Sequence, residues 1–160
     1  MTNFKTADLC DAHTGVSVVQ PVFRIYGNKT VFYGQIVTVK VFEDNILVRK
    51  VLGKDGDGKV LVVDGGGSLR CALLGDQLAA MAVSNKWSGI IIYGCIRDSS
   101  AINQMPIGVR ALHTHPLKSN KEGNGNINIP VEFAGTLFNP GEFLYADEDG
   151  IVVSPHPLID

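Results

Sequence analysis

The stretch "VLVVDGGGSLRCALLGDQLAAMAVSNKWSGIIIYGCIRD", residues 60–98, decides which fold the sequence predicts. It opens with an apolar run, residues 60–64, that has no polar face and is typical of a strand buried on both sides of a parallel sheet. Residues 75–86 follow with an apolar stripe at helical spacing, and residues 89–94 form a second apolar run. We interpret these three segments as a βαβ unit whose two strands run parallel.

The rest of the sequence extends this unit to an α/β fold in one domain, residues 1–160. Residues 28–44 are rich in β-branched and aromatic side chains and predict a strand. Residues 46–52 have apolar side chains at helical spacing and predict a short helix. Residues 108–116 and the alternating segment 124–154 predict further strands separated by turns.

Composition and charge exclude several classes of protein. The 14 basic and 16 acidic side chains give a formal charge of -2 without a basic stripe, so we expect no direct binding of nucleic acid. No apolar run approaches the roughly 20 residues of a membrane helix. The N-terminus lacks the apolar core of a signal peptide, which predicts a cytoplasmic protein. Three widely spaced cysteines, Cys10, Cys71 and Cys95, predict free thiols in a reducing compartment.

Parallel strands of a βαβ unit place their C-terminal ends at the edge of the sheet where α/β folds bind ligands. Three glycines, residues 65–67, follow the first strand. Gly75 and Asp76 begin the helix, and Arg97 and Asp98 follow the second strand. We therefore expect all of these residues to gather at one edge.

The residue types at this edge point to a small anionic ligand and a cation. The backbone amides of Gln77 and Leu78, at the helix start, can bind an anion. Arg97 can bind a carboxylate through two hydrogen bonds, and Asp76 and Asp98 can hold a hard divalent cation. A 2-oxo acid needs all three features, because a metal held by its carboxylate and keto oxygens stabilises its enolate. The alternative leaves Asp76 as a helix cap and Arg97 and Asp98 as a solvated pair in a turn.

The glycine run does not match a nucleotide-binding loop. Such a loop has the pattern G-x-G-x-x-G with the helix starting at once, whereas "SLRCALL" separates residues 65–67 from the helix. We expect these glycines to let the backbone approach the pocket closely, and a methyl-donor site is an alternative. His113 and His115, in "HTHP", share one face of a strand. Without a third ligand they predict a structural or surface role.

The sequence resembles the regulator of ribonuclease activity A family. The resemblance is carried by residues 59–98 together with "IGVRALHTHPLKSNKEGNG" and "PGEFLYADEDGIVVS". It implies a layered β/β/α fold like the swivelling phosphohistidine domain, built around a central βαβ unit, and a homotrimer or hexamer. The family includes a protein inhibitor of ribonuclease E. It also includes metal-dependent class II aldolases that cleave 4-hydroxy-4-methyl-2-oxoglutarate to two pyruvates and decarboxylate oxaloacetate.

The aldolases of this family share the pattern D-x20-R-D, which Asp76, Arg97 and Asp98 match. By resemblance, Asp98 binds Mg²⁺ or Mn²⁺, Arg97 contacts pyruvate, and Asp76 orders a water bound to the metal. The turn from Gly75 through the amides of Gln77 and Leu78 binds the pyruvate carboxylate. These roles imply a lyase that acts through a metal-stabilised pyruvate enolate, with a non-catalytic ribonuclease inhibitor as the alternative.

Two features depart from the family pattern. Ala101 stands where the family has an acidic residue three positions after the metal-binding aspartate. The longer aldolases also have a C-terminal extension that supplies an acidic residue to the neighbouring subunit, whereas this sequence ends at Asp160. Asp11 is a candidate for a carboxylate donated across a subunit interface, with a surface or capping role as the alternative.

Overall fold

The computed structural model describes residues 3–159 and contains the predicted parallel βαβ unit at its centre. Strands β4 (Val60–Asp64) and β6 (Gly89–Ile96) are parallel neighbours, and helix α3 (Asp76–Ser84) lies between them in the chain. The helix ends two residues earlier than predicted, because Lys86 takes a left-handed φ of 64°. The two predicted strands, the helix between them and the parallel direction of the strands are therefore confirmed.

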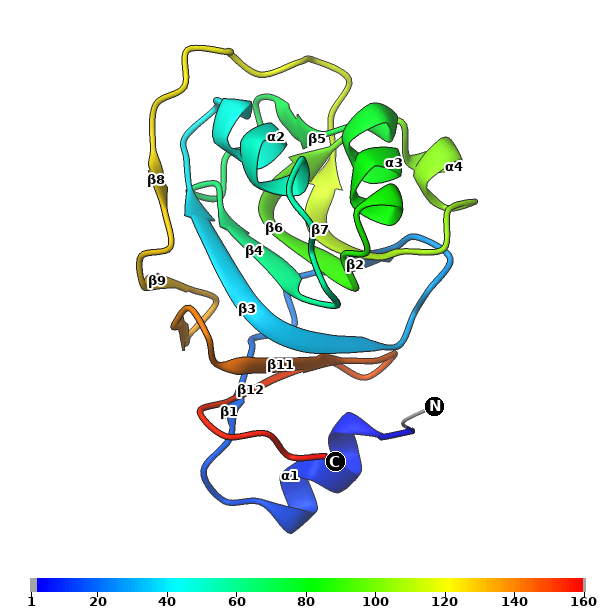
Figure 1. Cartoon of the computed structure of the whole chain (residues 1–160), viewed down its shortest axis with the longest axis vertical. Coiled ribbons are helices and arrows are strands. Elements are labelled where there is room, and N and C mark those ends of the chain that lie inside the picture. Colours follow the sequence, from blue (N-terminus) through cyan, green and yellow to red (C-terminus); the bar gives the residue numbers. More distant parts are fainter. Residues whose placement is uncertain (1–2, 160) are drawn as a thin grey trace.

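The central sheet is curled, and strand β3 (Phe32–Lys40) produces much of the curl (Figure 1). Its first half pairs antiparallel with β11 and its second half pairs parallel with β4. The predicted strand 28–44 was therefore too long at both ends. The other strands on the main path of the sheet are β1 (Ser17–Val18), β2 (Arg24–Tyr26), β7 (Gly108–Thr114), β11 (Phe143–Ala146) and β12 (Ile151–Ser154).

Two apolar cores lie on the two faces of this sheet. Leu61 and Val63 of β4 pack in the core beneath the helices, whereas Val60 and Val62 pack in the core on the other face. This alternation explains why β4 has no polar face, and each such burial stabilises the fold by about 1.5–3 kcal/mol. The mixed α/β class predicted from the sequence is confirmed.

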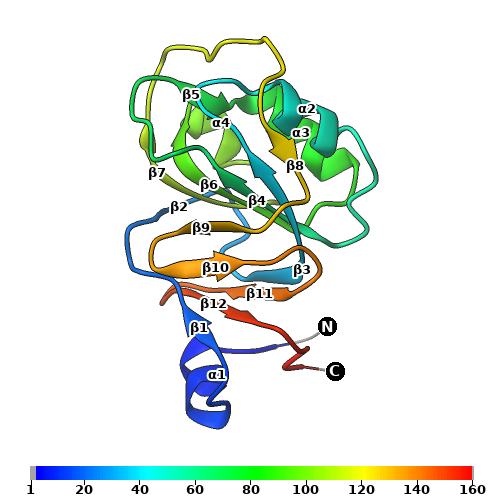
Figure 2. The same ribbon diagram turned by 90° about the vertical axis from the view of Figure 1, so that its left-hand side faces the viewer.

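Helices α2 (Ile46–Leu52), α3 and α4 (Ser99–Ile102) cover one face, and a second β layer covers the other (Figures 1 and 2). Helix α1 (Thr6–Ala12) lies at the far end of the molecule from α3 (Figure 2). Within residues 3–159, no helix has the length and apolar character needed to cross a membrane. The remaining elements of the two layers are β8 (Asn126–Ile127), β9 (Val131–Phe133) and β10 (Thr136–Phe138).

A short strand that the sequence analysis did not predict positions the ligand edge. Strand β5 (Ala72–Leu74) pairs parallel with the C-terminal half of β6, with Ala72 opposite Cys95 and Leu74 opposite Ile96. Strand β4 stops opposite Tyr93, so the rest of that side of β6 is free to pair with β5. The segment before α3 is therefore a strand of the sheet rather than a loose connection.

Candidate functional site

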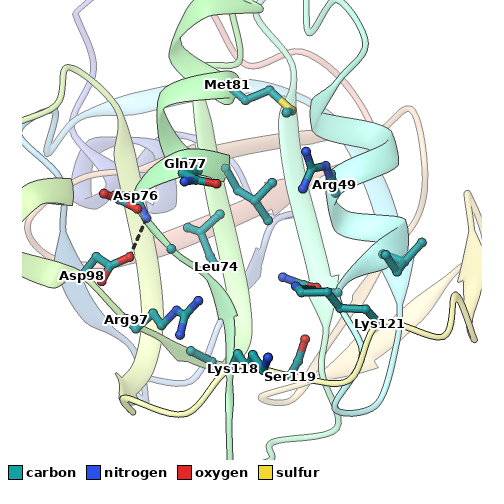
Figure 3. A pocket seen from close by; sticks show the side chains of 15 residues that line it. Arg49, Leu74, Asp76, Gln77, Met81, Arg97, Asp98, Lys118, Ser119 and Lys121 are labelled. Carbon is teal, nitrogen blue, oxygen red and sulfur yellow. Dashed lines mark hydrogen bonds between the residues drawn. The ribbon is translucent and has the colours of Figure 1, made fainter.

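A cavity of about 240 Å³ lies where α3 begins, at the C-terminal ends of β5 and β6 (Figure 3). Pockets for drug-sized ligands are larger, at roughly 300–1,000 Å³, so this cavity suits a small metabolite. The structure brings together all six residues that the sequence analysis selected. We call them the near wall of the cavity: Gly75, Asp76, Gln77, Leu78, Arg97 and Asp98.

Strand β5 brings the two halves of the near wall together. The backbone amide of Arg97 donates to the carbonyl of Leu74 at 2.9 Å, so the residues that follow β5 lie beside those that follow β6. The amide of Asp76 then donates to Oδ2 of Asp98 at 3.0 Å. This hydrogen bond between the two aspartates brings the two ends of the pattern D-x20-R-D together.

Asp98 has an unusual backbone conformation for this position. Its φ is 57°, in the left-handed region, which costs about 1 kcal/mol for a residue other than glycine. It stands before α4, yet its side chain makes no capping bond to that helix and is bound instead to the amide of Asp76. Gly75, not Asp76, is the N-cap residue of α3. The alternative is therefore wrong in making Asp76 the cap of α3, whereas its expectation that Asp98 lies in a solvent-exposed turn agrees with the structure.

Gly75 leaves no room for a side chain. A Cβ atom at this position would lie 2.9 Å from Oδ2 of Asp98 and 3.6 Å from Nε of Arg97. A side chain at this position would therefore displace the carboxylate of Asp98, whereas its contact with Arg97 would be an ordinary one. The glycine therefore lets the start of α3 approach the end of β6.

The start of α3 leaves backbone donors for a ligand. The first hydrogen bond of the helix runs from the amide of Ala79 to the carbonyl of Gly75 at 3.0 Å. The amides of Gln77 and Leu78 precede it and have no acceptor within the helix. Because the helix dipole adds partial positive charge at this end, the two amides favour a carboxylate.

Three basic residues of the cavity were missed by the sequence analysis. Arg49 comes from α2, and Lys118 and Lys121 come from the loop between β7 and β8. The loop belongs to the stretch "HTHPLKSNKEGNG" that carried the family resemblance, but its lysines had no assigned role. No local pattern marks them, because long-range contacts bring them to the cavity.

A buried carboxylate holds this loop in place. Oδ2 of Asp44, which is 2% exposed, accepts hydrogen bonds from the amides of Glu122 at 2.7 Å and Gly123 at 3.0 Å. Nζ of Lys121 donates to Oδ1 of Asn45 at 2.9 Å. Hydrogen bonds thus fix the side of the cavity that faces α3.

The charges of the cavity favour an anion. Arg49, Arg97, Lys118 and Lys121 line it together with only two acidic side chains, those of Asp76 and Asp98. In the part of the chain that the structure describes, none of these four basic side chains forms an ion pair. The chain as a whole has a formal charge of -2, so the excess of positive charge is local.

The carboxylates of the near wall fit a hard divalent cation. No group of three or more His, Cys, Asp or Glu side chains within residues 3–159 is arranged to hold a metal. Mg²⁺, however, is usually held by one or two carboxylates, with waters and substrate oxygens as its remaining ligands. Asp98 uses Oδ2 for the amide of Asp76, which leaves Oδ1, and the side chain of Asp76 lies in the same cavity. This donor set is compatible with Mg²⁺ or Mn²⁺.

The prediction that glycines 65–67 approach the cavity was wrong. The amides of Gly65 and Gly67 both donate to the carbonyl of Tyr93 at 3.1 Å, and the amide of Gly66 donates to Oδ1 of Asp64 at 2.9 Å. The φ angles of Gly66 and Gly67 are 68° and 73°, which only glycine adopts readily. These glycines form a closed turn that leads the chain from β4 into β5.

The histidines and Asp11 do not extend the cavity. Nδ1 of His113 accepts the amide of Thr114 at 2.8 Å, and Nδ1 of His115 accepts the amide of Leu117 at 3.1 Å. Both contacts agree with the predicted structural role. Asp11 is exposed on α1, at the opposite end of the molecule (Figure 2), so its contribution across an interface stays a prediction.

Comparisons with known proteins agree with this architecture. The RraA-like family model, described as Aldolase/RraA, matches residues 6–153. A Dechloromonas aromatica protein with the provisional name 4-hydroxy-4-methyl-2-oxoglutarate aldolase is 62% identical over 160 residues, which cover 97% of this chain and 98% of that protein. The RNA-processing inhibitor RraA from Thermus thermophilis has a structure with a TM-score of 0.95 at 45% identity, covering 98% of this chain and 95% of its own. A Geobacillus kaustophilus structure described as an S-adenosylmethionine:2-dimethylmenaquinone methyltransferase also reaches a TM-score of 0.95, at 52% identity over 97% of both chains.

Proposed function

Because the chain belongs to the RraA-like family, we propose that it is a divalent-metal-dependent lyase that acts on pyruvate-derived 2-oxo acids. Its expected reactions are cleavage of 4-hydroxy-4-methyl-2-oxoglutarate to two pyruvates and decarboxylation of oxaloacetate. One observation carries the proposal. A single cavity joins two free amides at a helix start, the Arg97 guanidinium and the carboxylates of Asp76 and Asp98.

The near wall supports a retro-aldol reaction that breaks the bond between C3 and C4 of the substrate. The amides of Gln77 and Leu78 hold the C1 carboxylate of the substrate. The C4 hydroxyl loses its proton, the bond between C3 and C4 breaks, and its electron pair forms the pyruvate enolate. Arg97 stabilises the negative charge that develops on the enolate oxygen. Asp76 positions a water that takes the hydroxyl proton and returns a proton to C3.

Asp98 is the residue we expect to hold Mg²⁺ or Mn²⁺. The bound cation supplies Lewis acidity that polarises the C2 keto group. The left-handed conformation of Asp98 and its bond to the amide of Asp76 fix the carboxylate at the mouth of the cavity. The left-handed backbone conformation costs about 1 kcal/mol, and strain of this kind concentrates at functional sites.

The proposal includes a homotrimer or hexamer, as the family resemblance implies. The side chains of Asp76 and Asp98 are exposed in one chain, which supports a site that a neighbouring subunit helps to close. Kinship with the swivelling phosphohistidine domain is also carried over from the resemblance, without a phosphohistidine role.

The direct test is pyruvate release from 4-hydroxy-4-methyl-2-oxoglutarate and from oxaloacetate, with Mg²⁺ or Mn²⁺ and then with a chelator. We expect turnover that the chelator abolishes, and its loss in Arg97→Ala and Asp98→Ala while the oligomer stays intact. Full activity in either variant would contradict the assigned roles. No turnover with metal present would contradict the lyase itself.

A non-catalytic regulator of a ribonuclease is the second candidate. It is favoured by the 45% identity and 0.95 TM-score to the RNA-processing inhibitor RraA. Such a regulator should bind an endoribonuclease in a pull-down with or without chelator, and Asp98→Ala should bind equally well. Metal-dependent turnover separates the lyase from this candidate.

Methyl transfer, named in the description of the Geobacillus structure, is not supported by the residues here. A methyl-donor site would need the glycines at 65–67 to cradle the ligand. Their amides are instead bonded to Tyr93 and Asp64, and Cβ atoms at Gly66 and Gly67 would meet the Phe42 and Tyr93 rings. Calorimetry with S-adenosylmethionine should therefore show no binding.

A further inference from the structure

The side of the cavity opposite the near wall also carries charged groups. We call Asn45, Arg49 and Lys121 the far wall. In Figure 3, Arg49 and Lys121 lie across the cavity from Asp76, Arg97 and Asp98. They come from α2 and from the loop between β7 and β8, whereas the near wall comes from α3 and the end of β6. A ligand that fills the cavity therefore meets basic side chains at both ends.

The far wall is held at a fixed distance from the near wall by Asn45. Its Nδ2 donates to the carbonyl of Leu73 in β5 at 3.2 Å, while its Oδ1 accepts from Nζ of Lys121. Asp44 adds a second connection. Its Oδ1 accepts a hydrogen bond, 3.1 Å long, from the amide of Ile46, where α2 begins. The same carboxylate holds the lysine loop, so both basic residues of the far wall depend on one buried anchor.

The charged groups of the two walls are suited to different parts of a ligand. The near wall already provides two amides and Arg97 for one carboxylate and its keto group. Arg49 and Lys121 are additional, and neither forms an ion pair with any carboxylate in residues 3–159. Lys121 uses one of its three N–H donors on Asn45, which leaves two for a ligand. The far wall is therefore suited to a second anionic group on the same ligand.

We propose that Arg49 and Lys121 bind the distal carboxylate of the substrate, and that they select dicarboxylic aldols over monocarboxylic ones. This inference rests on the proposed function. When the C3–C4 bond breaks, the fragment that departs keeps its carboxylate on the far wall while the enolate stays on the near wall. The charge of that carboxylate does not change during the reaction, so its contacts contribute to kcat/KM chiefly through KM.

The test compares two substrates that differ only at the distal group: 4-hydroxy-4-methyl-2-oxoglutarate, and 4-hydroxy-4-methyl-2-oxopentanoate, which has a methyl group there. Arg49→Ala and Lys121→Ala should each lower kcat/KM for the dicarboxylate by on the order of tenfold, with KM raised. The value for the monocarboxylate should stay within about twofold. Lys50→Ala is the matched control, because Lys50 is an exposed cation on the same helix that does not line the cavity.

Hydrogen–deuterium exchange at the methyl group of pyruvate, followed by NMR, separates the two proposals. Enolisation of pyruvate needs only the near wall, so exchange should be unaffected in both far-wall variants. If the wild-type protein catalyses exchange at the pyruvate methyl group while both variants lose the same fraction of kcat/KM for the two aldol substrates, that result would contradict the distal subsite and leave the lyase proposal intact. If the wild type neither exchanges pyruvate nor cleaves either aldol, the proposed function fails and the subsite fails with it.

Discussion

Two glycine-containing turns lie at the same edge of the sheet, and they differ in how their backbone amides are used. In the turn at residues 64–67, the amides of all three glycines are bonded within the chain. At the start of α3, the amides of Gln77 and Leu78 have no acceptor in the helix and face a cavity with an excess of basic side chains. Free backbone donors beside unpaired charges therefore identify the ligand site better than the number of glycines does.

The aspartates of the two turns differ in the same way. Asp64 is 8% exposed, and its Oδ1 accepts the amide of Gly66, two residues away. Asp98 is exposed and accepts the amide of Asp76, which is 22 residues away. The first aspartate closes its own turn, whereas the second joins two elements and lines the cavity. We expect substitutions at the first site to affect stability and those at the second to affect activity.

The largest expected effect comes from exchanging these aspartates for alanine. Asp98→Ala should lower kcat/KM for 4-hydroxy-4-methyl-2-oxoglutarate by on the order of a thousandfold, because the developing charge loses its main stabilisation. Asp64→Ala should keep activity within about threefold but lower the free energy of unfolding by about 1 kcal/mol, because the amide of Gly66 loses its acceptor. Steady-state kinetics measures kcat/KM, and urea unfolding measures the free energy of unfolding, for each variant. Equal loss of activity in the two variants would remove the distinction between the turns.

A matched pair of glycine substitutions should show a smaller contrast. In Gly75→Ala, the new methyl group would lie 2.9 Å from Oδ2 of Asp98, so the carboxylate must move and activity should fall on the order of tenfold. In Gly67→Ala, the φ of 73° imposes strain of about 1 kcal/mol or more on alanine, so the protein should unfold at lower urea with unchanged kcat. Titration of Mg²⁺ into Gly75→Ala should show weaker activation than in the wild type. If Mg²⁺ activates Gly75→Ala as well as the wild type, the displaced carboxylate of Asp98 still binds the metal and the prediction is contradicted.

The sequence predicted the centre of the fold because strong patterns lie there. The runs at residues 60–64 and 89–94 are apolar on both faces, which indicates parallel strands with cores on both sides. It could not predict β5, because three buried residues are too few for any periodicity to appear. Yet β5 is the element that brings Asp76 beside Asp98. The expected topology and the family pattern selected residues that the structure brings to one cavity, although the contribution of β5 was missed.

The far wall was not predictable from local pattern. Arg49 looked like an ordinary basic residue on the exposed side of a helix, and Lys121 lay in a polar loop. Their approach depends on the bonds of Asp44 to Glu122 and Gly123, which are 78 and 79 positions away in the sequence. A buried aspartate that orders a distant loop leaves no periodic trace in the sequence. Only the assembled structure shows these cations facing the near wall.

A smaller loss of activity than in Asp98→Ala or Gly75→Ala should come from Asp44, which anchors the far wall without touching ligand. Burial would raise the pKa of Asp44, but hydrogen bonds from the amides of Ile46, Glu122 and Gly123 outweigh it and lower the pKa below its ordinary value of 3.8. Asp44→Asn weakens these bonds, so kcat/KM for the dicarboxylate should fall only on the order of threefold as Lys121 becomes less well placed. The free energy of unfolding at pH 7 should fall by about 1–2 kcal/mol.

The pH dependence of this difference tests the role of the anchor. Because the folded pKa of Asp44 is depressed, its contribution is fully present above the unfolded pKa, near 3.8, and is lost as pH falls through the lower folded value. Urea unfolding should therefore give a constant difference between wild type and Asp44→Asn from pH 7 down to about 5, and a shrinking difference at lower pH. Asp8→Asn, on the exposed surface of α1, is the control and should show no such difference. A difference that persists unchanged below the folded pKa would mean that packing, rather than the ionised carboxylate, holds the loop beneath the far wall.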